Sequence, residues 1–213
     1  MVIPFISKVA RVRKQTEARL AEYKNKKVAF LFLIGVSSAI ATLGLVLNNS
    51  SIVIGAMVVA PLITPVFGFS LGLIILRMHR IFESLFMLVL GTIVALCISV
   101  LFSRLITLLD SHTLSITPEI IARAEPSVLF FIVAILSGLA GAYAYAKPEI
   151  LASIAGIAIA VAVIPPIAVS GIALVLNEWH LFQSSFLLYS INLLGICFGS
   201  LIMFLLLGFG KDI

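Results

Sequence analysis

Two long hydrophobic segments, each interrupted by prolines, constrain the fold of this chain more than any other feature. One runs from Ser51 to Leu76 and the other from Glu149 to Leu176, and Pro65 and Pro166 within them are 101 residues apart. A proline removes a backbone donor and clashes with the preceding turn, so it interrupts a helix. Two matched interruptions, half a chain apart, are typical of transporters in which broken helices from two repeats meet near the bilayer midplane.

The composition places most of the chain in a membrane. Hydrophobic residues make up 62% of the chain and charged residues 11%, whereas soluble domains are about 45–50% apolar and about 25% charged. Apolar runs of about 20 residues are long enough to cross a bilayer core. We therefore expect an all-α, polytopic integral membrane domain over residues 28–213, preceded by a basic segment over residues 1–27.

The basic segment predicts the orientation of the chain. It holds eight of the fourteen Lys and Arg residues, and a basic tail ahead of a first span is retained in the cytoplasm, where it faces anionic lipid rather than nucleic acid. Phe5, Val9 and Val12 form a modest apolar stripe, which predicts an interfacial helix. We expect no cleaved signal peptide, because the hydrophobic stretch that follows is a full span. The expected location is the cell membrane, with a cytoplasmic N-terminus.

Six crossings are expected, arranged as two inverted three-helix repeats. The expected spans are Val28 to Leu47, Ser51 to Leu76, Ile81 to Leu101 or a little beyond, Ser127 to Ala146, Glu149 to Leu176 and about Ser184 to Gly208. They give a first repeat over 28–103, an outer loop over 104–126 and a second repeat over 127–208. The repeats are inverted because each holds an odd number of crossings.

The alternative to six crossings is four spans plus two re-entrant hairpins. Six crossings place 12 of the 14 Lys and Arg residues inside, and two hairpins place 11 inside. The positive-inside rule therefore favours six crossings only slightly. The sequence is compatible with a homo-oligomer and does not determine the oligomeric state.

The broken segments predict a polar site in the middle of the membrane. Thr64 is expected to cap a half-helix that begins at Pro65, and a second half-helix is expected to begin at Pro166. Their converging positive ends favour an anion, whereas the carbonyl ends of the preceding half-helices favour a cation. The alternative is that the prolines only shape helix packing.

The candidate binding residues surround these breaks: Thr64, Pro65, Pro61, Pro165, Pro166, Gly55, Gly156, Asn192 and Arg123. Gly55 and Gly156 are again 101 residues apart. Asn192 is the only amide deep in an expected span, so it lines the site or hydrogen-bonds a neighbouring helix. Arg123 lies in a short outer helix capped by Thr117, where it pairs with Glu119 or attracts an anion.

The remaining motifs predict packing rather than chemistry. Small residues four apart allow helices to approach closely: Gly68 and Gly72, Gly195 and Gly199, Ser137 and Gly141, Ala152 and Gly156. Cys97 and Cys197 have no metal-binding spacing and are expected to be small buried packing residues. No cofactor or metal is expected.

The segment around Ser70 also fits the Gly-x-Ser-x-Gly pattern of serine hydrolases. That chemistry needs a base near the serine, and His79, His112 and His180 all lie in expected loops. We therefore do not expect an enzyme. No ionisable residue lies deep in an expected span, which argues against a proton-coupled pump.

Four segments resemble those of the prokaryotic membrane proteins grouped as domain of unknown function 389: VIGAMVVAPLITPVFGFSLG, TPEIIARAEPS, SGLAGAYAYA and SIAGIAIAVAVIPPIAVSGIAL. The resemblance covers the chain from about Ser37 to its end. It implies a bacterial or archaeal cell-membrane protein, and many members carry a soluble domain beside the membrane part. It implies no particular activity.

The leading hypothesis is a secondary transporter or facilitator of a small polar or ionic solute, with membrane lipid as its surroundings. The alternatives are an ion channel and a non-transporting membrane scaffold or assembly protein. The hypothesis rests on the broken helices, because the solute itself is not encoded in any motif.

Overall fold

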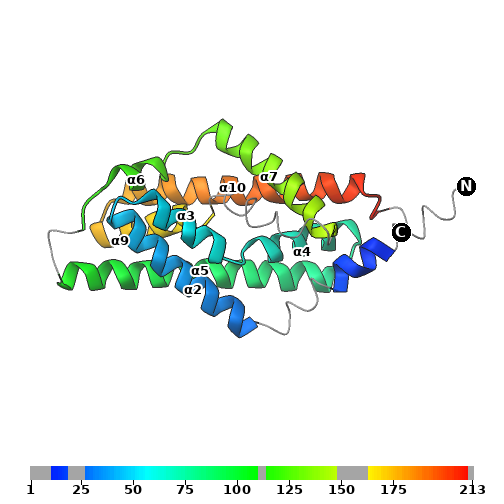
Figure 1. Cartoon of the computed structure of the whole chain (residues 1–213), viewed down its shortest axis with the longest axis horizontal. Coiled ribbons are helices and arrows are strands. Elements are labelled where there is room, and N and C mark those ends of the chain that lie inside the picture. The colour runs from blue at the N-terminus through cyan, green and yellow to red at the C-terminus, as the bar shows by residue number, and fades with distance from the viewer. Residues whose placement is uncertain (1–10, 19–26, 110–113, 148–162, 211–213) are drawn as a thin grey trace, which may run out of the picture.

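The computed structural model describes residues 11–18, 27–109, 114–147 and 163–210, which are mostly helical and contain no strand (Figure 1). Residues 11–18 form a short helix. The later helices are α2 (Lys27–Val46), α3 (Ser50–Val59), α4 (Ile63–Ile74), α5 (Met78–Leu109), α6 (Pro118–Ala122), α7 (Val128–Ala146), α9 (Ile164–Leu176) and α10 (Trp179–Leu206).

Four helices in the described ranges, α2, α5, α7 and α10, are long and apolar enough to cross a membrane, and α3 with α4 makes a fifth if the pair is one span. The chain is therefore that of an all-helical, multi-pass membrane protein. The expected spans at Val28 to Leu47 and Ser127 to Ala146 are confirmed as α2 and α7. The second broken segment includes residues 148–162, which lie outside the described residues together with Ala152 and Gly156.

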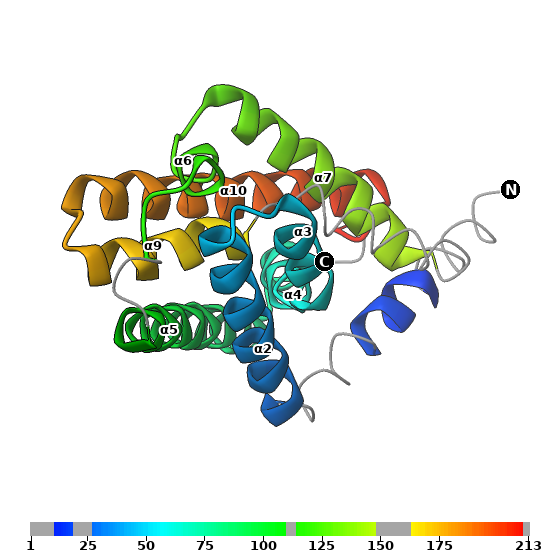
Figure 2. The same cartoon turned by 60° about the vertical axis from the view of Figure 1, so that its left-hand side comes forward.

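Two ends of the bundle can be distinguished (Figures 1 and 2). The basic end holds residues 11–18, the α4–α5 turn and the end of α10, and the α6 end holds α6 and the α9–α10 turn. The long helices α5 and α10 run in opposite directions between these ends. The expected N-terminal interfacial helix includes Phe5 and Val9, which lie outside the described residues.

Helix α5 is longer than expected. It continues to Leu109 instead of ending near Leu101, so the expected outer loop over 104–126 begins later. Arg104 has a high helix propensity, and no Gly or Pro follows Gly91 within the helix to stop it. The polar residue Arg104 therefore does not end helix α5.

Helix α10 begins at Trp179, earlier than the expected Ser184. Helix α9 ends against Asn177, whose φ of 58° lies in the left-handed region that Asn tolerates. This residue reverses the chain within two residues, so the stretch expected to be a loop is the first turn of α10.

The first predicted break is present as two helices at an angle. Helices α3 and α4 are bent by 48° across residues 60–62, and Pro61 lies within this break. At the end of α3, the hydroxyl of Ser37 donates a hydrogen bond of 2.6 Å to the carbonyl of Ala56. A side chain of α2 therefore satisfies one of the carbonyls that the helix end leaves without an intrahelical donor.

Equivalent helices of the two chain halves begin at a constant sequence separation. The paired starts are Lys27 and Val128 for α2 and α7, Ile63 and Ile164 for α4 and α9, and Met78 and Trp179 for α5 and α10. Each pair is 101 residues apart. The turns follow the same spacing, because Leu76 and Asn177 both have left-handed backbone, with φ of 51° and 58°.

Glycines bring α7 and α10 into close contact, as the small-residue spacing predicts. A methyl group at Gly199 would overlap the carbonyl of Ile135, and one at Gly195 would lie 2.6 Å from the Cβ of Ala134. Gly138, which the sequence analysis did not single out, is equally close to the carbonyl of Ile196. The nearest atoms at Gly138 and Gly199 belong to backbone, and the one at Gly195 is the Cβ of Ala134, so none of them is the end of a flexible side chain that could move aside.

The expectation that Cys97 is buried is wrong. Cys97 is exposed and Cys197 is half-buried. The buried face of α5 includes Ala95 and Ser99, and a residue midway between two positions four apart points to the opposite side of a helix. Since α5 is apolar on every side, its sequence does not reveal which face is buried.

Gly199→Ala should lower the free energy of unfolding by about 1–3 kcal/mol, because the new methyl group overpacks a rigid crossing. Gly55→Ala is the matched control. Its Cβ would meet nothing within 4 Å, so stability should be unchanged or up to about 1 kcal/mol higher through helix propensity. Thermal unfolding of the purified protein in one detergent compares the two variants, and equal losses would contradict the described α7–α10 contact.

Candidate functional site

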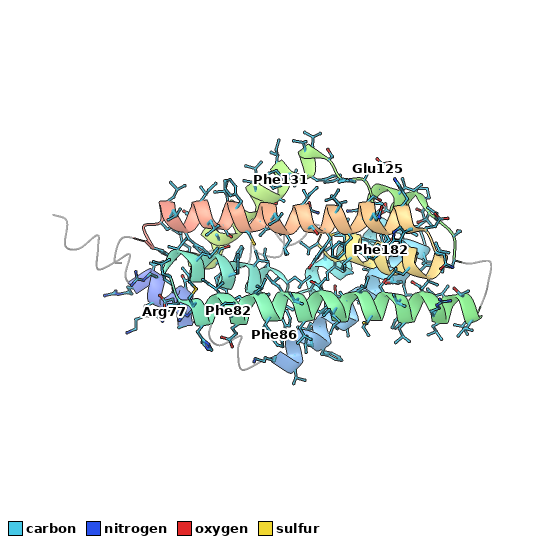
Figure 3. All side chains as sticks on the ribbon, turned by 180° about the vertical axis from the view of Figure 1, so that it is seen from behind. Arg77, Phe82, Phe86, Glu125, Phe131 and Phe182 are labelled. Carbon is cyan, nitrogen blue, oxygen red and sulfur yellow. The ribbon has the colours of Figure 1, made fainter. Side chains whose placement is uncertain are left out.

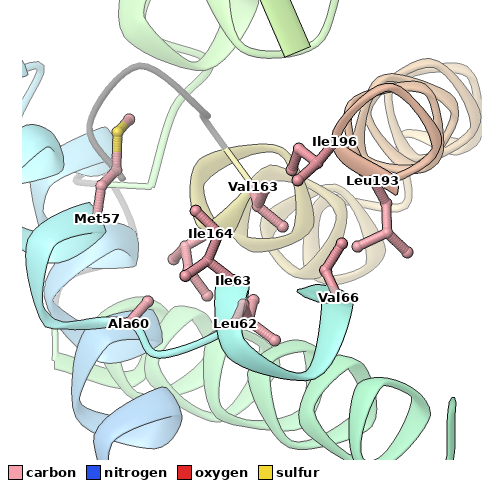
Figure 4. Close-up of a pocket in the computed structure, with 9 residues that line it drawn as sticks. All are labelled: Met57, Ala60, Leu62, Ile63, Val66, Val163, Ile164, Leu193 and Ile196. Atoms are coloured by element: carbon pink, nitrogen blue, oxygen red, sulfur yellow. The ribbon is translucent and has the colours of Figure 1, made fainter. Parts of the chain in front are cut away.

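The starts of α4 and α9 converge on one pocket in the middle of the bundle (Figure 4). Its volume of about 20 Å³ is enough for about one water molecule. The described residues that line it are all apolar: Met57, Ala60, Leu62, Ile63, Val66, Val163, Ile164, Leu193 and Ile196. The start of α9 therefore lies beside the first predicted break, and the described residues between them form a narrow apolar pocket.

Equivalent residues of the two halves face this pocket. Leu62 and Val163 are the residues that precede the two helices, and Ile63 and Ile164 are their first residues. Both pairs have the 101-residue spacing. The pocket therefore lies where the two halves approach each other with the same structural elements.

The predicted capping of these helices is wrong in detail. Helix α4 begins at Ile63, two residues before Pro65, and Thr64 makes no capping hydrogen bond because it is already inside the first turn. Helix α9 likewise begins at Ile164, two residues before Pro166. A proline is tolerated throughout the first turn, where the backbone N–H groups have no intrahelical acceptor.

The prolines also change what these helix starts can bind. Pro65 removes one of the first N–H groups of α4, and Pro165 and Pro166 remove two from α9. An anion at a helix N-terminus is held largely by those N–H groups. The helices can consequently begin in apolar surroundings with few unsatisfied donors, and the pocket offers an anion fewer hydrogen bonds than the sequence analysis expected.

Of the other predicted site residues, Asn192 lies next to the pocket and Gly55 lies away from it. Asn192 is buried, 4% exposed, and precedes the pocket residue Leu193, about 20 Å along α10 from Trp179. Gly55 lies on an exposed face of α3, and Gly156 lies outside the described residues.

Arg123 is far from the pocket in the fold, because it belongs to the α6 end. Its Nη2 atom lies 3.5 Å from a carboxylate oxygen of Glu119, as the spacing of four residues predicts. The predicted cap is confirmed, since the Oγ1 of Thr117 accepts a hydrogen bond from the backbone of Ile120 at 3.3 Å. Thr117 also donates to the carbonyl of Leu45 at 2.7 Å, which fastens α6 to the end of α2.

Two serine contacts join the halves, and sequence reasoning missed them. Ser99 on α5 packs against Gly171 on α9 and donates a hydrogen bond of 2.7 Å to the carbonyl of Ala168. On the opposite side, the hydroxyl oxygens of Ser200 on α10 and Ser70 on α4 are 2.7 Å apart. Ser99 and Ser200 are 101 residues apart, as are Ser70 and Gly171, so each contact repeats the other with the halves exchanged. That shared spacing is the sequence signal that could have found them.

Large side chains close the bundle between the pocket and the basic end. The Phe67 ring packs edge-on against Tyr145 and Phe204, with centroid distances of 5.6 and 6.2 Å. Phe204 stacks on Phe209 at 5.5 Å. At the α6 end, an open groove of about 510 Å³ lies between Pro126 and the start of α10.

Comparison with known proteins places these features in a family. The profile described as "Domain of unknown function (DUF389)" matches residues 57–198, which include the pocket residues. The archaeal "Uncharacterized protein MJ0678" of Methanocaldococcus jannaschii is 24% identical over 197 residues. The match covers 91% of this chain and 58% of that protein. No solved structure matches the chain.

A cysteine pair tests whether the two helix starts meet. In a Cys97→Ala/Cys197→Ala background, Ile63→Cys with Ile164→Cys should be joined by a short bifunctional thiol reagent, because both side chains line one pocket. The matched control pairs Ile63→Cys with Leu176→Cys, at the other end of α9, about 18 Å along the helix. Mass spectrometry of the linked peptides measures the yield, and equal yields for both pairs would contradict the shared pocket.

Proposed function

The chain belongs to the domain of unknown function 389 family, and on that premise we propose that it is a membrane transporter or facilitator of a small solute. The observation that carries this proposal is the central pocket. Two helices at equivalent places in the two halves begin there, inside the bundle rather than at its ends. Helices that start within the membrane are the feature that transporters built from repeats use to form their solute path.

We further propose that the two halves are inverted repeats. The constant sequence separation of equivalent helix starts supports this proposal, as do the opposite directions of α5 and α10. The exchanged serine contacts give further support. Two repeats related by a two-fold axis in the membrane plane produce all three features. The axis reverses the direction of each helix, and each helix keeps the equivalent neighbouring helices.

We infer the orientation from the charges. In the described part of the chain, the basic end carries Arg11, Arg13, Lys14, Arg77, Arg80 and Lys147, whereas Arg104 and Arg123 lie toward the α6 end. The remaining described basic residue, Lys27, is the first residue of α2. The positive-inside rule assigns the basic end to the cytoplasm. The six-crossing arrangement, with both termini inside, agrees with this assignment.

In the proposed mechanism, the halves rock against each other around the pocket. Their contacts use small side chains such as Ser99, Gly171 and Ser70, which allow close packing and leave few large groups to obstruct a small displacement. In the described conformation the pocket has room for about one water molecule, so it is closed to any larger solute. Rocking would widen it toward one end and then the other.

The apolar lining of the central pocket favours passage of a solute over tight binding of it. The pocket residues carry no charge, and the prolines withhold N–H groups from an anion. Asn192 and Thr64 are the polar side chains next to the lining residues Leu193 and Ile63, and they are the candidates for contact with a polar solute when the pocket widens.

A channel is the second candidate, and the apolar lining favours it specifically. A narrow hydrophobic constriction blocks ions because water leaves it, and a polar substitution there restores a wet path. A transporter and a channel differ in what happens after such a substitution. In a channel the ion flux is continuous, whereas in a transporter it still depends on the movement of the halves.

Leu193→Ser should increase the leak of K⁺ and Cl⁻ from vesicles by about tenfold or more, because it places a hydroxyl in the constriction. Leu194→Ser is the matched control. Leu194 is the next residue of α10 but is 64% exposed to the surroundings of the bundle. The assay uses purified protein in phospholipid vesicles, with ion-sensitive dyes inside and protein-free vesicles as the baseline.

The result separates the three functions. Unitary current steps of Leu193→Ser in a planar bilayer would identify a channel, and flux without such steps would support a transporter. If Leu193→Ser leaks no more than Leu194→Ser while both variants insert normally, the solute path is rejected, and a scaffold or assembly role replaces it.

A further inference from the structure

A cluster of arginines surrounds one carboxylate at the basic end. One oxygen of Glu17 lies 3.1 Å from the guanidinium of Arg80 and 3.5 Å from that of Arg77, and its other oxygen lies 3.6 Å from Arg13. Arg13 also donates a hydrogen bond of 3.3 Å to the carbonyl of Phe209. Glu17 thus gathers arginines from the N-terminal helix and from the start of α5 at one point.

Among the described ion pairs of this cluster, Arg77 and Arg80 share the single carboxylate of Glu17. The Nη1 atom of Arg80 is enclosed and has no hydrogen-bond partner anywhere in the described residues. The side chain of Arg77 is 60% exposed and can turn toward a ligand beside it. A guanidinium donor that is shielded from water and unmatched indicates that a partner is missing from the site.

An apolar stripe leads away from the cluster along α5. Met78, Phe82 and Phe86 follow one another at intervals of four residues and are 63%, 68% and 60% exposed, so they lie on one face of the helix. Figure 3 shows Phe82 and Phe86 following Arg77 along this helix. Val89 and Ile93 continue the exposed apolar surface toward the middle of the bundle.

We propose that this surface binds one anionic phospholipid of the cytoplasmic leaflet. Arg77 and Arg80 hold the phosphate of the headgroup, for which the planar guanidinium is well suited, and an acyl chain lies along Phe82 and Phe86. Glu17 positions the two arginines without neutralising them. The stripe distinguishes this ligand from free phosphate, because an inorganic ion has no apolar part to cover those rings. The inference rests on the proposed cytoplasmic orientation of the basic end, and it does not depend on transport.

Native mass spectrometry measures the bound lipid directly. The full-length protein is exchanged into vesicles of phosphatidylglycerol and phosphatidylcholine, released in mild detergent, and compared with the Arg80→Gln variant. Retained phosphatidylglycerol should fall about fivefold, since one arginine near a membrane surface accounts for about that factor. Arg104→Gln is the matched control, because Arg104 is an exposed arginine near the other end of the same helix.

Two further experiments distinguish a lipid phosphate from free phosphate and control for a variant that does not fold. Thermal unfolding in detergent should rise with added phosphatidylglycerol and remain unchanged with the same concentration of inorganic phosphate. If Arg80→Gln does not fold, the exposed Arg77→Gln replaces it, with the same expected loss. Equal losses for Arg80→Gln and Arg104→Gln, unchanged retention in both cluster variants, or full protection by inorganic phosphate would each overturn the proposal.

Discussion

Every backbone N–H and C=O group inside a bilayer needs a partner within the protein, and the structure depends on how this chain meets that requirement at its interior helix ends. The starts of α4 and α9 would ordinarily expose free N–H groups to hydrocarbon. Prolines in the first turn of each helix remove some of these groups, and Ser37 donates a hydrogen bond to the carbonyl of Ala56 at the neighbouring end of α3. The prolines and the Ser37 hydrogen bond therefore reduce the number of unpaired backbone groups at these helix ends.

This solution explains the chemistry of the central pocket. A helix start that retained all its N–H groups would attract water or an anion, whereas these two starts present Ile63 and Ile164 to each other. The pocket is narrow and apolar for that reason. Around it, Ser99 with Gly171 and Ser200 with Ser70 allow the halves to approach closely at two equivalent places. In the described residues, the centre of the bundle is thus a narrow apolar pocket between two similar halves.

The sequence predicted the fold better than the site. The first and fourth spans and the cap at Thr117 follow from local hydrophobicity and capping rules, so they agree with the structure. The starts of α4 and α9 were displaced by two residues, because a proline is compatible with several positions of the first turn. The exposure of Cys97 was missed, because a helix that is apolar on all sides gives no amphipathic signal. The pocket lining was not predicted either, since it consists of ordinary Ile, Leu and Val residues that no motif distinguishes.

The sequence by itself determined that this chain is helical and membrane-embedded, and that it contains matched prolines 101 residues apart, because hydropathy and proline geometry act over short distances. Only the tertiary structure decided that the starts of α4 and α9 share one pocket and that its described lining is apolar. It also decided that Glu17 gathers Arg77 and Arg80 at the basic end. These features depend on which faces of distant helices meet, and in a chain that is hydrophobic on almost every face, packing selects those faces and local patterns do not.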